Sequence, residues 1–138
     1  MAGDGPKLEQ WQNKYSEKSF IQFLGFRNDV ASLISSCDIV ALLSYSEALP
    51  TILIESIFLK KPIIATNVGE TKHIIKYKVI EAGVLLNKKP SKPQVCSAIE
   101  EMLDKSRYQN FSENTDVIKK QFEVERMANE YLKCFNEK

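Results

Sequence analysis

Residues 38–66 read DIVALLSYSEALPTILIESIFLKKPIIAT, and this stretch decides the fold. Its two ends, residues 38–43 and 62–66, are short apolar runs rich in β-branched residues, which is typical of buried strands. Between them, a loop over residues 44–49 leads to Pro50, where proline suits the first turn of a helix. One face of this helix, which we expect to end near residue 59, carries Ile54, Ile57 and Phe58. A strand, a helix and a second strand in this order predict a parallel βαβ unit.

The same alternation extends in both directions along the chain. Short apolar runs predict strands at Phe20–Leu24 and Gly83–Leu86, and helices are expected over residues 7–15, 29–36 and 71–77. Ser91 and Gln94 form a capping box that starts a further helix, and a last helical region follows it. The apolar stripes of these two helices are Val95, Ala98, Ile99, Met102 and Leu103, and then Val124, Met127, Ala128, Tyr131, Leu132 and Phe135. The predicted class is α/β, with a Rossmann-like parallel sheet and flanking helices in one domain over residues 1–138.

Composition excludes several classes of protein. The 138 residues are 43% hydrophobic and 27% charged, as in ordinary globular domains. A net charge of +1 gives no reason to expect nucleic acid as a partner. The longest apolar run, residues 39–43, is far shorter than the roughly twenty residues that span a bilayer, and residues 1–20 hold no signal-peptide core. We therefore expect a cytoplasmic protein whose three cysteines are reduced thiols.

The charge is unevenly distributed along the chain. Residues 60–92 carry eight lysines against two glutamates, between two acidic flanks. Such lysines are either solvated surface residues or part of a surface that faces an anionic substrate or lipid headgroups. The sequence leaves both interpretations open.

Residues 44–55 carry the strongest functional signal. They follow a buried strand and open a helix, so the unpaired backbone N–H groups of residues 49–52 are expected to face a ligand crevice at the carboxyl edge of the sheet. Together with the helix dipole they favour a phosphate group. Glu47 precedes these amides and Glu55 follows them, and carboxylates accept hydrogen bonds from sugar or ribose hydroxyls.

Two other interpretations of these glutamates are open. A glycosidase pair needs carboxyls roughly 5–9.5 Å apart, whereas eight helical positions at about 1.5 Å each would place them roughly 12 Å apart. This distance disfavours a hydrolase. Spacing alone leaves open that Glu47 and Glu55 are only solvated surface charges.

The motif Ser-x-Ser-Glu-x-x-Pro-x-x-x-x-Glu at residues 44–55, followed by Lys-Lys-Pro-Ile-Ile-Ala-Thr-Asn-Val-Gly at residues 60–69, carries a resemblance to a known family. It resembles the C-terminal domain of retaining glycosyltransferases of family 4, which have the GT-B fold. Gly-Asp-Gly-Pro at residues 3–6, Phe-Leu-Gly at 23–25 and Cys-Asp-Ile-Val at 37–40 fit the same domain in the same order. The resemblance covers roughly residues 3 to 135.

The resemblance implies a hexosyltransferase that moves a sugar from a nucleotide-sugar to a saccharide or lipid-linked acceptor with retention. It implies a catalytic role near the donor sugar for Glu47, and ribose binding for Glu55. The remaining donor-binding residues that it implies are Ala48, Leu49, Pro50, Thr51 and Ile52 around the diphosphate and sugar, and Gly25, Phe26 and Arg27 beside the base. No cofactor and no obligatory metal are implied.

Three residues depart from the family pattern. Ala48 stands where a glycine usually follows the first glutamate, Glu70 replaces the second glycine of a Gly-Gly turn, and His73 replaces a later acidic residue. A carboxylate at position 70 would repel a sugar diphosphate unless it turns away or pairs with Lys72.

The family's N-terminal acceptor domain, and a basic Arg/Lys pair upstream of residues 3–6, have no counterpart in this chain. We therefore expect a truncated domain that is inactive in isolation and that needs the missing acceptor domain as a partner. In the full-length enzyme we expect contact with the anionic inner face of the membrane. The alternative function is a non-catalytic nucleotide-binding or interaction domain of the same fold, and a flavodoxin-like regulatory domain is disfavoured because no cluster of phosphoacceptor aspartates is visible.

Truncation also predicts how the sheet and the last helix behave. It would remove the strands between Phe20–Leu24 and Asp38–Leu43, so we expect these two runs to pair directly, with a dimer contact at the exposed sheet edge. Val124 and Met127 are expected to pack on their own domain. Tyr131 and Phe135 are expected to pack on a neighbouring chain or to fray.

Overall fold

The structure is a computed structural model that describes residues 1–136. The chain forms two compact units, one covering Met1–Leu33 and a second that starts at Ile34. The boundary falls within helix α2 (Val30–Ser36). Each unit is described by itself.

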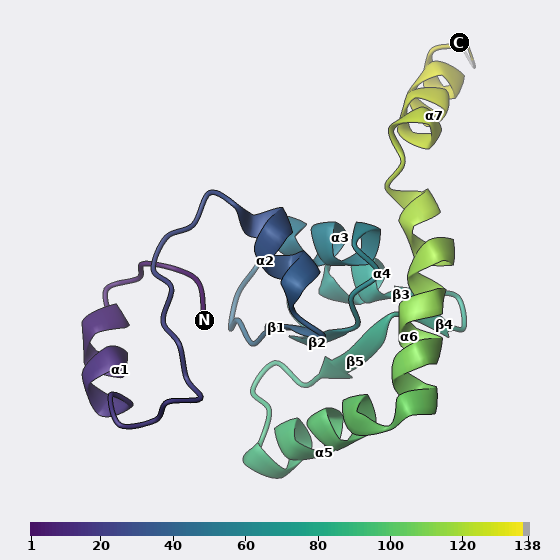
Figure 1. Ribbon diagram of the computed structural model, residues 1–138. Coiled ribbons are helices and arrows are strands. Elements are labelled where there is room, and N and C mark those ends of the chain that lie inside the picture. Colours follow the sequence, from purple (N-terminus) through teal and green to yellow (C-terminus); the bar gives the residue numbers. More distant parts are fainter. Residues whose placement is uncertain (137–138) are drawn as a thin grey trace. The chain divides into compact units, whose positions relative to one another are not determined.

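The first unit contains the short helix α1 (Leu8–Lys14) and a long irregular segment after it (Figure 1). The predicted strand Phe20–Leu24 is wrong, because Phe20 lies in a turn and residues 21–24 have no regular secondary structure. Their hydrogen bonds lead to the start of the chain instead: the Leu24 N–H donates to Met1 O at 2.8 Å, and the Gly3 N–H donates to Gly25 O at 2.8 Å. The expected direct pairing with Asp38–Leu43 is therefore also wrong.

The second unit is built on a parallel sheet of three strands. These are β1 (Val40–Leu42), β2 (Ile63–Thr66) and β5 (Gly83–Leu86), in the order β1-β2-β5. The helices of this unit are α3 (Thr51–Phe58), α4 (Thr71–Ile75), α5 (Lys92–Leu103), α6 (Lys105–Ile118) and α7 (Val124–Asn136), with a 3₁₀ turn at Lys119–Gln121. The α/β class and the parallel sheet flanked by helices are confirmed.

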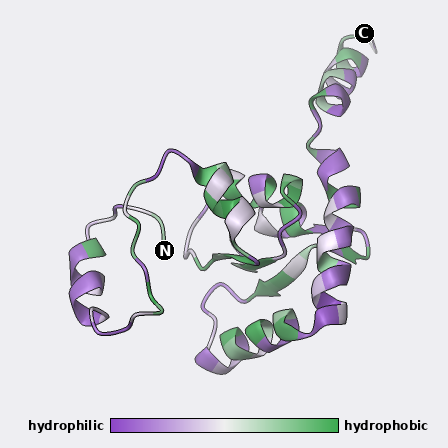
Figure 2. Cartoon of the chain, in the orientation of Figure 1, coloured by the Kyte–Doolittle hydropathy of each residue, from purple (hydrophilic) through white to green (hydrophobic). Residues whose placement is uncertain are grey.

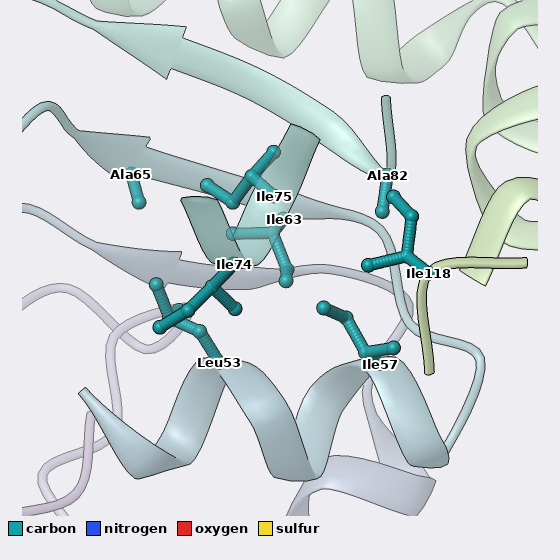
Figure 3. Packing of buried hydrophobic residues seen from close by; sticks show 8 residues of the cluster. All are labelled: Leu53, Ile57, Ile63, Ala65, Ile74, Ile75, Ala82 and Ile118. Atoms are coloured by element: carbon teal, nitrogen blue, oxygen red, sulfur yellow. The ribbon is translucent and has the colours of Figure 1, made fainter. Parts of the chain in front are cut away.

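Alternation along β2 gives the sheet two buried faces. One cluster contains Leu53, Ile57, Ile63, Ala65, Ile74, Ile75, Ala82 and Ile118, and Figure 3 shows these side chains between α3 and the strands. A second cluster contains Ile64, Leu86, Ala98, Met102 and Phe111. Because successive side chains of a strand point to opposite faces, Ile63 and Ala65 serve one cluster and Ile64 serves the other. A strand buried on both faces reads as a continuous apolar run, which is why β2 was predictable.

The predicted helix over residues 71–77 ends early. Helix α4 stops at Ile75, and residues 76–77 form β3 (Lys76–Tyr77), which pairs antiparallel with β4 (Ile80–Glu81). Lys78 takes a φ of 56° in the turn between these strands. A left-handed residue cannot continue a helix, and the period-2 pattern here is too short to be read from sequence.

The apolar faces of two helices differ from those predicted. In α3 the buried residues are Leu53, Ser56 and Ile57, whereas Phe58 is 46% exposed. In α5 Ala98 and Met102 are buried as expected, but Ile99 and Leu103 are exposed. Ser91 caps α5 by accepting a hydrogen bond from the Gln94 N–H at 3.4 Å.

Helix α6 was not expected from the sequence, because its residues are mostly polar. Figure 2 shows it largely in the hydrophilic colours. Only three of its residues are buried, Phe111, Thr115 and Ile118, at intervals of four and three. Asp104 caps its start by accepting from the Arg107 N–H at 2.8 Å.

Helix α7 has no buried residue. The expectation that Val124 and Met127 pack on their own domain is wrong, since they are 75% and 50% exposed. Tyr131 and Phe135 are also exposed, at 65% and 74%, and contact with a neighbouring chain stays a prediction. Within residues 1–136 there is no helix with the length and apolar character needed to cross a bilayer.

Candidate functional site

The carboxyl ends of the three parallel strands lie at one edge of the sheet. Leu42 of β1 is level with Ala65 of β2, which is level with Leu85 of β5. Figure 3 shows the arrowheads pointing the same way, with α3 running back beneath them. The loops that follow these strands therefore emerge side by side, where open α/β sheets place their ligands.

The loop between β1 and α3 is fixed to the next strand by a buried hydroxyl. The Thr66 Oγ1–H donates a hydrogen bond to Ser44 O at 2.5 Å, and Thr66 is 1% exposed. Because Thr66 is the last residue of β2, this bond sets where the chain leaves β1. Thr66 was not predicted as a site residue, although a hydroxyl that ends an otherwise apolar strand was a usable signal.

The turn after β2 packs directly on the backbone of this loop. Gly69 has a φ of 51°, and a Cβ added to it would lie 2.5 Å from Ala48 O and still nearer Glu47 O. The Glu70 N–H donates to Ala48 O at 3.0 Å. Only glycine fits at position 69, since any side chain would meet the loop and pay the cost of the left-handed conformation.

Helix α3 begins beyond this loop without a side-chain cap. Pro50 is its N-cap residue, with φ −74° and ψ 93°, and provides no side-chain hydrogen bond. The Leu53 N–H bonds to Pro50 O at 3.1 Å, but an α-helix offers no internal partner for its first amides, here Thr51 and Ile52. Unpaired amides together with the helix dipole favour an anion, so the predicted phosphate position at this helix start stays a prediction.

Two carboxylates flank that position along the chain. Glu47 is half-buried in the loop before the helix, and Glu55 is exposed on the helix itself. Tyr45 and Leu49 in the same loop are also exposed, at 69% and 54%. The arrangement can hold a phosphate at the helix start and accept hydroxyl donors on either side of it.

Glu70 adds a third carboxylate from the neighbouring loop. It is the N-cap residue of α4, yet its side chain makes no capping hydrogen bond. Among residues 1–136, the ion pairs include neither Glu70 nor Lys72. The pairing of Glu70 with Lys72, one of the two ways to avoid repulsion, is therefore not formed. His73 is exposed on α4.

The other predicted donor-binding residues, Gly25, Phe26 and Arg27, belong to the first unit. Gly25 has a φ of 63° and Phe26 is 70% exposed. The Arg27 guanidinium donates to both Asp29 carboxylate oxygens, at 2.7 and 2.6 Å. This hydrogen bonding lowers the pKa of Asp29 and raises that of Arg27. Their role beside a base stays a prediction.

The candidate site is an exposed surface. In the second unit a hollow of about 430 Å³ lies beside α5 and α6, lined by Met102, Leu103, Lys105, Tyr108, Gln109, Ser112 and Glu113. None of these residues belongs to the loops at the strand ends. Within residues 1–136 no three His, Cys, Asp or Glu side chains are grouped so as to hold a metal ion.

The family of the chain follows from its similarity to known proteins. The sequence profile of one family, described as "Glycosyl transferases group 1", matches residues 1–117. The chain belongs to this family. A curated relative of this glycosyltransferase domain, N-acetyl-alpha-D-glucosaminyl L-malate synthase of Bacillus anthracis, is 27% identical over 136 residues, which cover 95% of the chain and 35% of the relative.

Solved structures show the same fold. HepE of Anabaena, crystallised with UDP and glucose, is similar with a TM-score of 0.78 at 20% identity, over 99% of the domain and 40% of that chain. A glycosyltransferase of Rickettsia africae has a TM-score of 0.75 at 23% identity, over 99% of the domain and 38% of that chain. The glycosyltransferase domain thus spans between a third and two fifths of the length of these proteins. The glycosyl transferases group 1 family and the fold of a GT-B glycosyltransferase domain are confirmed, whereas family 4 and the retaining mechanism stay predictions.

Proposed function

We propose that this domain is the donor-binding part of a retaining glycosyltransferase of family 4, which moves a hexose from a nucleotide-sugar to a saccharide or lipid-linked acceptor. The observation that carries the proposal is the uncapped start of α3 between Glu47 and Glu55 in a chain of the glycosyl transferases group 1 family. UDP is the proposed nucleotide, because HepE was crystallised with UDP and with UDP-glucose.

The donor is proposed to lie along the start of α3. The Thr51 and Ile52 amides would donate to its diphosphate, where the helix dipole stabilises negative charge. Glu55, one turn further into the helix, would accept hydrogen bonds from the ribose hydroxyls. Glu47, on the opposite side of the amides, would then approach the transferred sugar as the catalytic carboxylate.

Charge stabilisation by the protein is proposed to make an obligatory metal or cofactor unnecessary. Developing charge on a leaving diphosphate is stabilised by fixed N–H dipoles at no reorganisation cost. The α3 amides are the proposed donors of this domain, and we propose that turnover needs the remaining polypeptide of the full-length relatives, which brings further donors and the acceptor site. The isolated domain is then inactive.

The location and the remaining partners are also proposals. The eight lysines of residues 60–92 support the proposal that the full-length enzyme acts at the anionic cytoplasmic surface of a membrane. Each lysine near such a surface contributes about 1 kcal/mol of binding free energy. The free edge of β1, which pairs only with β2 within the described sheet, supports contact with a second chain.

The test is a calorimetric titration of the domain with UDP. Because the site is open, we expect weak binding with a dissociation constant of about 0.1 to several millimolar. Glu55→Ala should weaken it about tenfold to a hundredfold, since a hydrogen bond to a charged group contributes about 1.5–3 kcal/mol. Glu100→Ala, an exposed carboxylate of α5, is the matched control and should bind as the wild type does.

The alternative is a non-catalytic nucleotide-binding or interaction module of the same fold. It predicts UDP binding without turnover even when the domain is joined to an acceptor domain. Transfer of radiolabelled sugar by the full-length gene product would exclude it. Absence of UDP binding at millimolar concentration would overturn the donor-site proposal itself.

A further inference from the structure

We infer that Glu70 faces the donor sugar, and that its charge makes this site bind nucleotide donors of neutral sugars more tightly than donors of uronic acids. The inference rests on the proposed function, because it assumes a nucleotide-sugar at the start of α3. It assigns a specificity role to a residue that the motif of residues 44–55 does not contain.

Position is the first argument. Gly69 and Glu70 lie on the backbone of Glu47 and Ala48, and the Glu70 N–H donates to Ala48 O at 3.0 Å. This contact fixes the Glu70 backbone at the loop that carries Glu47. The left-handed Gly69 allows the close approach, so the position of Glu70 follows from the backbone and does not depend on its side chain.

Availability of the carboxylate is the second argument. Glu70 is exposed, and its side chain does not cap α4, although it occupies the N-cap position. Among the described residues it has no ion-pair partner. A carboxylate with no structural bond is free to accept hydrogen bonds from a ligand.

The proposed pose of the donor places its sugar near Glu70. A ribose beside Glu55 and a diphosphate on the Thr51 and Ile52 amides place the sugar toward the loop before the helix. That loop presents Glu47, and Glu70 lies against it. A sugar in this position would lie beside the two adjacent loops that carry Glu47 and Glu70.

The chemical consequence is selection by charge. Hydroxyl and amide N–H groups of glucose-type sugars donate hydrogen bonds to carboxylates, which is a favourable contact. The carboxylate of a uronic acid has no proton to donate at pH 7 and is repelled by Glu47 and Glu70 together. The site then accepts neutral sugars and rejects uronates.

The experiment compares UDP-glucose with UDP-glucuronate by calorimetry at low ionic strength. The readout is the ratio of their dissociation constants, in which contributions from the shared uridine and diphosphate cancel. Wild type should favour UDP-glucose, and Glu70→Gln should reduce that preference about fivefold, as expected for one like-charge contact in water. Glu70→Gly removes the side chain altogether and should give the same reduction. Glu100→Gln makes the same charge change on α5 and should leave the ratio unchanged.

Two outcomes would overturn the inference. If UDP-glucose binds but both Glu70 variants keep the wild-type ratio, Glu70 does not face the sugar, and the proposed donor site still stands. If the domain binds neither UDP nor either UDP-sugar, the proposed function fails and the inference fails with it.

Discussion

At the scale of single residues, Gly69 joins fold and site. Its φ of 51° and the closeness of Ala48 O leave no room for a side chain. We predict that Gly69→Ala lowers the free energy of unfolding by about 2–4 kcal/mol, from backbone strain and from displacement of the 47–48 loop. Urea denaturation measures it.

Gly25→Ala separates the two costs in that prediction. Gly25 has a similar φ of 63°, but an added Cβ would have no atom within 4 Å. In this variant the free energy of unfolding should fall only by the conformational cost, which is about 1 kcal/mol. Equal losses in the two variants would show that Gly69 does not press on the loop.

Sequence reasoning found Glu47, Glu55 and the amides between them, because a strand followed by Pro50 indicated the start of a helix at a strand end. It did not find Thr66 or the contact of Glu70 with Ala48. Both are hydrogen bonds between segments about twenty residues apart, and single-sequence patterns do not encode such pairings. The roles of all these residues toward a ligand stay predictions.

At the scale of elements, α6 holds the end of α3. The Ser112 hydroxyl donates to Lys60 O at 2.9 Å, and the Lys60 ammonium donates to Asp116 at 2.7 Å. Lys60 has a φ of 58°, so this left-handed turn after α3 is held by contacts from α6. Hydrogen bonds from Lys119 and Lys60 lower the pKa of Asp116 to about 2.

This pKa predicts a pH dependence of stability. Because the folded carboxyl has a pKa below its ordinary value near 3.8, its contribution is complete above about pH 5 and is lost as the pH falls through about 2. We expect Asp116→Asn to lower the melting temperature at pH 6, with the difference from wild type shrinking below about pH 4 and vanishing below about pH 2. A difference that stays constant over this range would contradict the ion pair.

The polar sequence of α6 also conceals its contribution to the first core cluster. Ile118 is 0% exposed and lies in the cluster with Ile57 and Ile63. We predict that Ile118→Ala destabilises the domain by about 2–5 kcal/mol. Val117→Ala, a neighbouring residue that is 39% exposed, should cost less than about 1 kcal/mol, and equal effects would contradict this packing.

At the scale of the whole molecule, the sequence predicted the second unit far better than the first. Parallel strands buried on both faces gave clear apolar runs, and β5 was predicted with its observed bounds. Phe20–Leu24 gave a similar run, yet its hydrogen bonds go to Met1 and Lys18 and not to a sheet. An apolar run becomes a strand only where a partner strand is available, and the pattern of one segment does not report that.

Helix α7 also shows that the pattern of one segment does not report its packing partner. Its apolar stripe is regular, but all of its residues are exposed in this chain. Replacing both Tyr131 and Phe135 by Ser should therefore change the free energy of unfolding by less than about 0.5 kcal/mol. A loss of several kcal/mol would show that α7 packs on the rest of the second unit.

The central claim is that the start of α3 binds the diphosphate of a nucleotide. Backbone amide NMR of the labelled domain during titration with UDP tests it most directly. The account predicts that the largest shifts fall on residues 47–52, that they are weaker with UMP, and that amides of α5 do not move. Saturating shifts confined to other segments, or none at millimolar UDP, would contradict it.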